Sequence, residues 1–472
     1  MPEQDICWKD AVELAGDVRT RRVSPLEVVR HVLDRIERLN PVINAYVTVC
    51  AESALAEATK AEEAVMRKRE IGPLHGIPVS FKDLIHTAGI RTTLGSRLFA
   101  DLVPGEDAVL VARLKQAGAI VLGKTNTPEF GYKPLTENPL FGITRNPWNL
   151  DRTPGGSSGG AAAAVAAGLG PLAVGNDGGG SIRIPSSCCG VFGLKPHLGR
   201  IPRYPAFAGS EIITHEGPIT RTVRDAALML DIMAGPHWGD CFSLPATGTV
   251  FSEFVGRGVK GLRFAWSSDL GYAEVDPEVR RICESAALTF AGMGAVVEEA
   301  SPGFLNNEKH IGTLFGVDGL TALSDLGELE QFADRLDPLT HVMLLVSAQV
   351  SVMDYVRAMF ARREISVAMG RFLQTYDLLL TPTLALPPLP VGYPDAAGFL
   401  KWIPFTFPFN LTGQPAASVP AGWTADGLPV GLQIVGRAHD EATILRAASA
   451  FEEAQPWSGR KPPVTCTIQE TC

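Results

Sequence analysis

Two serines in glycine-rich turns are the residues of this chain best suited to covalent chemistry. Ser157 follows Gly155-Gly156, and Ser181 follows a run of three glycines, all within the stretch 153–185. Glycine adopts backbone conformations that other residues resist, so such turns can direct free N–H groups at an anion or a developing oxyanion. A serine hydroxyl attacks a carbonyl only when a base takes its proton. We therefore predict a hydrolytic centre with two serines and a basic third member.

A lysine upstream of the serines, Lys82, is the candidate base. It ends the apolar run 77–81, which predicts that its aliphatic stem is enclosed. Burial disfavours the charged form of a lysine and lowers its pKa, and only the neutral amine can accept a proton. An ion pair between Lys82 and the adjacent Asp83, or another acid, is the alternative interpretation. The residue pattern leaves both open.

Other interpretations compete for the glycine–serine turns. Purely structural turns are the simplest interpretation, but two of them, each with a serine, around an alanine-rich segment are harder to explain in this way. A nucleotide loop is disfavoured because neither turn carries the lysine of GxxxxGK[ST]. The segment 155–159 matches the GxSxG nucleophile elbow, which needs an apolar strand before it and an acid and a histidine after it. The preceding segment 146–152 reads as a loop, and His439 beside Asp440 is the one suitably late histidine, so a Ser-His-Asp triad is disfavoured.

Composition limits the class of protein. The chain has 472 residues, is 46% hydrophobic and carries a net charge of −9, which argues against nucleic acid as a partner. Its eight cysteines form no CxxC pair, which favours reduced, buried thiols. No signal-peptide pattern and no run of about 18 apolar residues occurs, so we expect a cytoplasmic protein that does not enter a membrane.

Hydrophobic periodicity predicts an α/β fold in one domain, 1–472. The first 70 residues read as helices, of which one starts at Ser24-Pro25 and stops at Asn40-Pro41. A strand over 76–81, a helix over 107–116 and a strand over 119–122 predict a parallel crossover unit. Further helices are predicted over 51–69, 161–167, 221–234, 277–293, 351–376 and 440–454, and strands over 172–174, 262–265, 295–298, 377–380, 416–420 and 429–435.

Five segments carry their own predictions. Ser181 should begin a helix that Pro185 interrupts, and residues 301–350 hold mixed helical signals without a strong strand. Residues 382–408 read as an ordered loop, and residues 458–472 as a loose tail. The first 70 residues are expected to pack on the rest of the domain.

Six motifs in order resemble the amidase signature hydrolases. They are PLHGIPVSFKD at 73–83, AIVLGKTNTPEF at 119–130, TRNPWN at 144–149, PGGSSGGAAAAVAAG at 154–168, GNDGGGSIRIPSSCCGVFGLKP at 175–196 and PFNLTGQPAASVP at 408–420. The resemblance implies a large central sheet, mixed but mostly parallel and twisted, covered by helices on both faces.

The resemblance also implies a catalytic Ser–cis-Ser–Lys triad. Lys82 matches the family's base, Ser157 the serine with a cis peptide bond, and Ser181 the nucleophile. Ser181 would form an acyl-enzyme with the substrate while its proton passes through Ser157 to Lys82. The backbone N–H groups of Gly178, Gly179, Gly180 and Ser181 would form the oxyanion hole. Neither a cofactor nor a metal is implied.

Neighbouring residues would support this centre. Asp177 and Arg183 match charged positions that hold the nucleophile loop, and Ser158 is expected to hydrogen-bond next to the triad. Phe130 and Tyr132 are candidates for the wall of the substrate pocket.

The chain departs from the family pattern at three nearby positions. Gly178 stands where many members carry a larger residue, which would leave room beside the oxyanion loop. Asn176 replaces a common Thr or Ser, and His197 follows a Lys-Pro pair where Thr or Ser is frequent. These departures bear on substrate preference, not on the triad.

The function expected from the resemblance is hydrolysis of a carboxylic amide, similar to bacterial amidases of the aryl, nylon-oligomer and urethane-cleaving kind. Alternatives are a carbamate or ester hydrolase, the glutaminase subunit of a tRNA-dependent amidotransferase, and an inactive binding scaffold. The expected partner is a small-molecule amide, with a homodimer as the one assembly considered.

Overall fold

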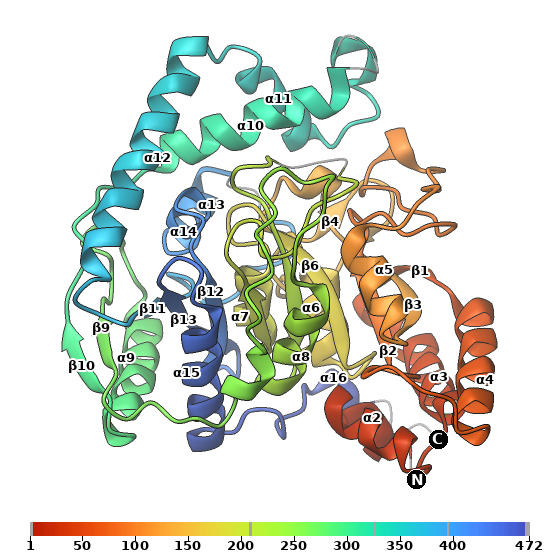
Figure 1. Cartoon of the computed structure of the whole chain (residues 1–472). Helices are drawn as coiled ribbons and strands as arrows, with labels where there is room; N and C mark the ends of the chain where they lie inside the picture. The colour runs from red at the N-terminus through yellow and green to blue at the C-terminus, as the bar shows by residue number, and fades with distance from the viewer. Residues whose placement is uncertain (1–2, 207–209, 325–326, 328, 394–395, 468–472) are drawn as a thin grey trace.

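One large sheet organises the molecule. The computed structural model describes residues 3–206, 210–324, 327, 329–393 and 396–467. Within these residues an eleven-stranded sheet has the order β1-β3-β2-β6-β8-β7-β12-β13-β11-β9-β10 (Figure 1). Its strands are β1 Tyr46–Val49, β2 Pro78–Lys82, β3 Ile120–Thr125, β6 Leu172–Asp177, β7 Phe192–Lys195, β8 His215–Thr220, β9 Arg263–Trp266, β10 Val296–Glu299, β11 Leu378–Pro382, β12 Ala416–Trp423 and β13 Pro429–Gly436. The short strands β4 Glu137–Asn138 and β5 Gly142–Ile143 form a separate pair.

The predicted mixed, twisted sheet is confirmed. Parallel pairing joins β2 to β3 and β6 on one flank, and β9 to β10 and β11 on the other. The strands between these two blocks pair antiparallel, including the predicted hairpin of β12 and β13. The crossover from β2 through helix α5 to β3 is also as predicted.

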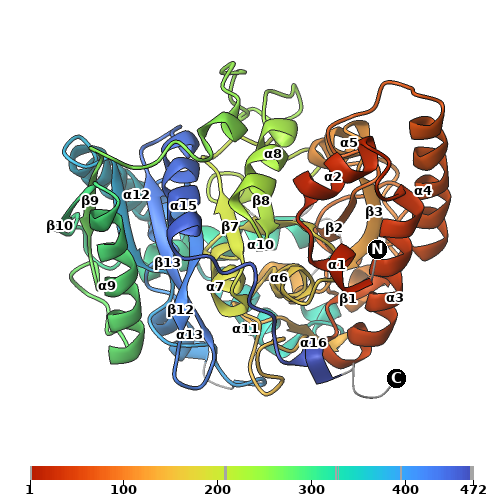
Figure 2. The same ribbon diagram turned by 90° about the horizontal axis from the view of Figure 1, so that it is seen from below.

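Helices cover both faces of the sheet (Figure 2). One face packs against α2 Ala11–Arg19, α5 Val109–Gln116, α8 Val223–Met233, α9 Pro277–Gly292 and α15 Glu441–Ala454. The other packs against α3 Pro25–Ile43, α4 Ala51–Met66, α6 Gly159–Ala166, α7 Arg183–Cys189, α12 Val352–Phe372 and α14 Pro408–Leu411. The remaining helices are α1 Glu3–Trp8, α10 Glu308–Ser324, α11 Pro338–Ser347, α13 Ala396–Trp402 and α16 Val464–Thr467, with 3-10 turns at Arg97–Phe99, Glu129–Gly131, Phe251–Phe254 and Leu329–Phe332.

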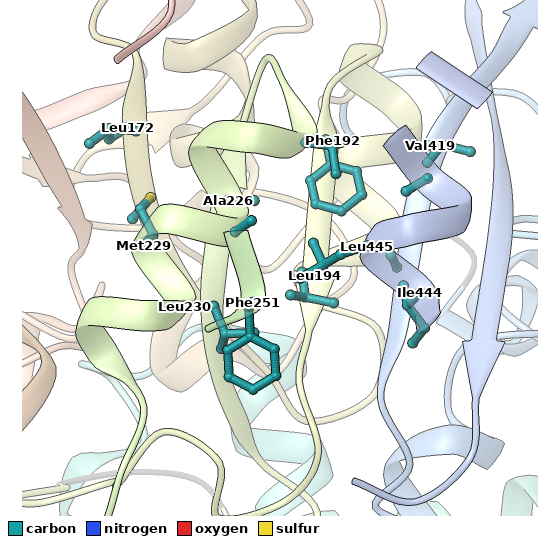
Figure 3. Close-up of a cluster of buried hydrophobic side chains, with 14 of the residues drawn as sticks. Leu172, Phe192, Leu194, Ala226, Met229, Leu230, Phe251, Val419, Ile444 and Leu445 are labelled. Atoms are coloured by element: carbon teal, nitrogen blue, oxygen red, sulfur yellow. The ribbon is translucent and has the colours of Figure 1, made fainter. Parts of the chain in front are cut away.

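The core on the first face is built from aliphatic and aromatic side chains of strand and helix. Phe192 and Leu194 of β7 lie between Ala226 of α8 and Leu445 of α15, and all four side chains are fully buried (Figure 3). Burying each such side chain contributes about 1.5–3 kcal/mol. These contacts anchor the central strands of the sheet to α8 and α15.

Helix α3 begins as predicted but runs past its expected stop. Ser24 and Glu27 form a capping box, and Pro25 occupies the first helical position. The helix continues to Ile43 through Pro41, because a proline in the last turn removes only one hydrogen bond near the C-terminus. Asn44, in the left-handed conformation, ends it.

The predicted interruption at Pro185 and the predicted loop 382–408 are both wrong in part. Helix α7 contains Pro185 in its first turn, where the missing N–H has no helical partner to lose. The segment 382–408 contains helix α13, Ala396–Trp402, in which Trp402 is fully buried. Burial of its aromatic residues, not local periodicity, stabilises this helix.

The segment 458–472 is not loose throughout. It contains α16, and both Val464 and Thr465 are buried, so this part packs on the core beside α3 and α6. Residues 468–472 lie outside the described residues.

In the described part of the chain, no single helix is long and apolar enough to cross a membrane. Helices α11 and α12 reach the necessary length and apolar composition only when taken together, and the two are bent by 98° relative to each other.

Candidate active site

The candidate residues gather at one edge of the sheet. Lys82 is the last residue of β2, and Asp177 is the last residue of the parallel neighbour β6. Since parallel strands end at the same edge, the turn after β6 that carries Ser181 lies beside Lys82. Ser157 reaches the same place from the turn before α6. The amide N–H of Ser158 donates to the carbonyl of Ser181 over 3.1 Å, which joins the two serine turns.

Lys82 contacts Ser157 directly. Its Nζ lies 2.6 Å from Ser157 Oγ and 2.6 Å from Asn176 Oδ1, and its side chain is fully buried. The Gly156–Ser157 peptide bond is cis. Asp83 instead accepts hydrogen bonds from the backbone N–H and hydroxyl of Thr93. The Lys82–Asp83 ion pair that the sequence left open does not form.

The environment of Lys82 favours the neutral amine. Burial lowers the pKa of Lys82 from 10.5 to about 7, although the carboxylates of Glu216 and Asp177 act to raise it. A neutral lysine has one lone pair and two N–H bonds. It can therefore accept a hydrogen bond from Ser157 while it donates to the amide oxygen of Asn176.

A buried carboxylate holds the turn that carries Ser181. Asp177 accepts hydrogen bonds from the backbone N–H groups of Gly180, over 2.7 Å, and Ile182, over 3.2 Å. It also accepts hydrogen bonds from Nε and Nη2 of Arg183, each over 2.9 Å. Burial alone would raise the pKa of Asp177, but the Arg183 guanidinium outweighs it and holds that pKa well below its usual range. Both charges are fully buried, so the pair fixes the loop.

Distant segments complete the hydrogen bonding of Arg183. Its Nη1 donates to the carbonyl of Thr406 and to Gln433 Oε1, and its Nη2 donates to Asn410 Oδ1 over 2.6 Å. Sequence reasoning gave none of these partners a role. Asn410 lies in the motif 408–420, so the motif was the available signal, whereas nothing in the sequence indicated Gln433.

The oxyanion-hole prediction needs one correction. The N–H of Gly180 donates to Asp177, so it is not free to bind a substrate oxygen. The N–H groups of Gly178, Gly179 and Ser181 have no acceptor among the residues that the structure describes. Three donors therefore remain beside Ser181.

Ser158 and Asn176 tie the turn that carries Ser157 to β6. The hydroxyl of Ser158 donates to the backbone carbonyl of Asn176 over 3.2 Å. Asn176 was noted in the sequence only as a departure from the family pattern. The structure shows that its side chain contacts Lys82, which its position one residue before Asp177 could have indicated.

An apolar cavity of about 280 Å³ opens over Ser181. Tyr132 lines it, whereas Phe130 lies outside the lining and packs edge-on against Tyr132, with ring centroids 6.1 Å apart. The cavity is lined by Gly131, Tyr132, Lys133, Pro134, Gly179, Ser181, Ile184, Ile311, Gly312, Phe315, Leu339, Met343, Phe399, Leu400, Ile403 and Phe407. Phe130 therefore supports the wall without forming it.

The geometry supports neither a Ser-His-Asp triad with His439 and Asp440 nor a metal site. His439 stacks on His197 with ring centroids 3.9 Å apart, and Asp440 caps α15 through the N–H of Thr443. Among the described residues, no three His, Cys, Asp or Glu side chains come together in a way that could hold a metal ion.

Known proteins are similar to this chain in sequence and in fold. A family model described as Amidase matches residues 27–445. The chain is 42% identical over 471 residues to the acylamidase of Rhodococcus erythropolis, covering 98% of each. It is 36% identical over 476 residues to one of the subunits of the glutamyl-tRNA(Gln) amidotransferase of Geobacter metallireducens, covering 95% of this chain and 98% of that protein. The solved structure of 6-aminohexanoate cyclic dimer hydrolase complexed with substrate matches with a TM-score of 0.90 at 33% identity, covering 97% of this chain and 99% of the other.

These matches extend over nearly the whole chain and include the segments that form the buried lysine and the two serine turns. The relative from Rhodococcus erythropolis is named an acylamidase, and the solved structure is that of a hydrolase. The chain is an amide-hydrolysing enzyme and belongs to the amidase signature family.

Proposed function

We propose that this enzyme cleaves an uncharged carboxylic amide through an acyl-enzyme on Ser181, with Ser157 as proton relay and Lys82 as base. The observation that supports this proposal most strongly is the 2.6 Å contact between Ser157 Oγ and a lysine Nζ that is fully buried and makes no ion pair among the described residues. A buried lysine without a carboxylate partner is costly unless its neutral form is used.

In the proposed acylation step, neutral Lys82 takes the proton of Ser157, and Ser157 takes that of Ser181. Ser181 Oγ then bonds to the amide carbon. The free N–H groups of Gly178, Gly179 and Ser181 are the donors available to the oxygen on which negative charge develops. The proton returns from Lys82 through Ser157 to the amide nitrogen, the C–N bond breaks, and the amine leaves.

The proposed deacylation step repeats this path with water. Water gives a proton through Ser157 to Lys82, and its oxygen bonds to the acyl carbon. The bond from that carbon to Ser181 Oγ breaks, and the proton on Lys82 returns through Ser157 to Ser181. The products are a carboxylate and an amine or ammonia, and no oxidant or metal enters the balance.

The cavity supports an apolar substrate rather than glutamine. Glutamine would need a cation for its α-carboxylate, and Lys133 is the charged residue of the lining. Lys133 Nζ already binds Asp337 over 2.8 Å and Glu137 over 3.2 Å. We therefore favour amide hydrolysis over the glutaminase reaction considered for the amidotransferase relatives. Carbamates and esters share the tetrahedral chemistry, and a matched anilide, aryl ester and carbamate would rank the three by kcat/KM.

Replacement of the proposed nucleophile tests this function. Ser181→Ala should lower the release of an aniline from an acyl anilide by roughly 10³-fold or more. Ser187→Ala on α7 removes another buried serine that lines no part of the cavity, and should keep its activity. A Ser181→Ala enzyme that is folded and as active as Ser187→Ala would refute the proposal.

A further inference from the structure

Helix α10 reaches over the loop that carries the nucleophile. A Cβ atom added to Gly178 would lie 2.7 Å from Phe315 Cε2 and 3.2 Å from Thr214 Oγ1. Atoms this close must move apart. The room that the sequence predicted beside Gly178 is therefore filled by the ring of Phe315. The glycine and the phenylalanine fit as a pair.

The ring of Phe315 is held in place by other aromatic residues. It packs edge-on against Tyr132, with ring centroids 5.0 Å apart and an interplanar angle of 68°. Gly319, one turn further along α10, has no side chain, and a Cβ atom there would collide with the Tyr132 hydroxyl. Close packing of Tyr132 on the helix thus fixes where Phe315 points.

A bare position lies next to Phe315 on the same helix face. Gly312 precedes Phe315 by three residues, a spacing that places two side chains side by side on a helix. Both residues line the cavity, yet a Cβ atom on Gly312 would meet nothing within 4 Å. Helix α10 therefore presents one bulky ring and one empty position to the space above Ser181.

We propose that Phe315 and Gly312 set the size of the acyl group that this enzyme accepts, and that this group is an uncharged aryl ring or an alkyl chain of several carbons. The inference rests on the proposed function and specifies its substrate. Phe315 limits the cavity beside the oxyanion loop, and Gly312 leaves the space into which the far end of the acyl group extends.

The chemistry assigns this cavity to the acyl group rather than to the amine. The leaving amine takes its proton from Ser157, and water later approaches the acyl carbon from the side that the amine has left. That side must admit water. The acyl group stays bound to Ser181 through both steps, so the apolar cavity suits it better.

Two variants with opposite effects test the inference. Purified enzyme is given anilides whose acyl chains run from acetyl to decanoyl, and kcat/KM is measured for each. Phe315→Ala should raise the preference for long over short chains by roughly 10-fold, and Gly312→Val should lower it by a similar factor, since one methylene in an apolar pocket changes selectivity about 10- to 200-fold. Phe372→Ala and Gly370→Val, the same substitutions on α12 and outside the cavity, should leave the preference unchanged.

These measurements distinguish a failure of the acyl-size inference from a misfolded variant and from a failure of the proposed function. A chain-length preference that neither variant moves, or one that moves only in a series of N-alkyl acetamides, overturns the inference. If Phe315→Ala loses its fold in a thermal scan, Gly312→Val still decides, because a helical glycine with open space around it accepts a side chain. Wild-type enzyme that cleaves none of the anilides would overturn the proposed function and this inference together, whereas cleavage with an unmoved preference overturns the inference alone.

Discussion

Replacing Asn176 by aspartate should move the pH dependence of this enzyme to higher pH. Asn176 Oδ1 lies 2.6 Å from Lys82 Nζ, so Asn176→Asp would place a carboxylate beside the base. The new charge stabilises the protonated lysine, and Lys82 must lose that proton before it can act. More alkaline solution is then needed to produce the neutral amine.

The size of the effect follows from the distance. Two unit charges 2.6 Å apart attract each other by about 6 kcal/mol at an effective dielectric constant of 20. Burying the new carboxylate offsets several kcal/mol of this attraction. A net of about 2 kcal/mol would raise the pKa of Lys82 from about 7 to roughly 8.5. At pH 7.5 the neutral fraction, and with it kcat/KM, should fall roughly 8-fold.

The assay is kcat/KM for one anilide between pH 5.5 and 10. The wild-type profile should rise with a midpoint near the lowered pKa of Lys82, about 7, and level off above it. The control Asn306→Asp adds the same charge at an exposed loop and should leave the midpoint in place. An Asn176→Asp enzyme with an unshifted midpoint, or a wild-type profile that is flat across this pH range, would refute Lys82 as the titrating base.

Three further predictions concern the packing and charges around the nucleophile loop. Gly178→Ala should lower kcat, and adding Phe315→Ala should restore part of it, because the added Cβ meets that ring at 2.7 Å; strictly additive losses would contradict the contact. Arg183→Lys should lower the free energy of unfolding by roughly 3 kcal/mol and reduce kcat, because lysine cannot form the paired hydrogen bonds to Asp177. A urea titration and a rate measurement check the two effects, and unchanged values would contradict the role of the Asp177–Arg183 pair. Between pH 7 and 10.5 the unfolded chain binds more protons at Lys82 than the folded chain does, so wild-type stability gains from this group as pH rises. Lys82→Met should therefore be more stable than wild type at pH 7, by at most roughly 5 kcal/mol, and urea titrations should show this advantage shrinking toward pH 10; an advantage independent of pH would contradict the neutral, buried lysine.

Local pattern was enough to predict the elements that carry the site. The strand before Lys82 and the crossover to β3 follow from short apolar runs bounded by turn residues, and these signals are local. The glycines that precede Ser157 and Ser181 predicted that both lie in turns, and the structure brings those turns together. Their common location depends on the parallel pairing of β2 with β6, whereas the predicted crossover joined β2 only to β3.

Other features depend on contacts that no local pattern encodes. Helix α10 contains Gly312, Gly316 and Gly319, which weaken its helical propensity, so the segment 301–350 gave only mixed signals. Two of these glycines, Gly316 and Gly319, allow close approach of Ser347 and Tyr132 from other elements. The use of the Gly180 N–H by Asp177 and the contact of Asn176 with Lys82 likewise arise from how the turn folds back on β6.

The site of covalent attachment shows directly whether Ser181 or Ser157 is the nucleophile. Wild-type enzyme is mixed with an activated anilide or a fluorophosphonate, quenched within the first turnover, digested and analysed by mass spectrometry. We expect one acyl or phosphonyl adduct, on the peptide that contains Ser181 and on that serine. The adduct should be absent from Ser181→Ala and form much more slowly in Lys82→Met. An adduct on Ser157, or full labelling of folded Ser181→Ala, would contradict it.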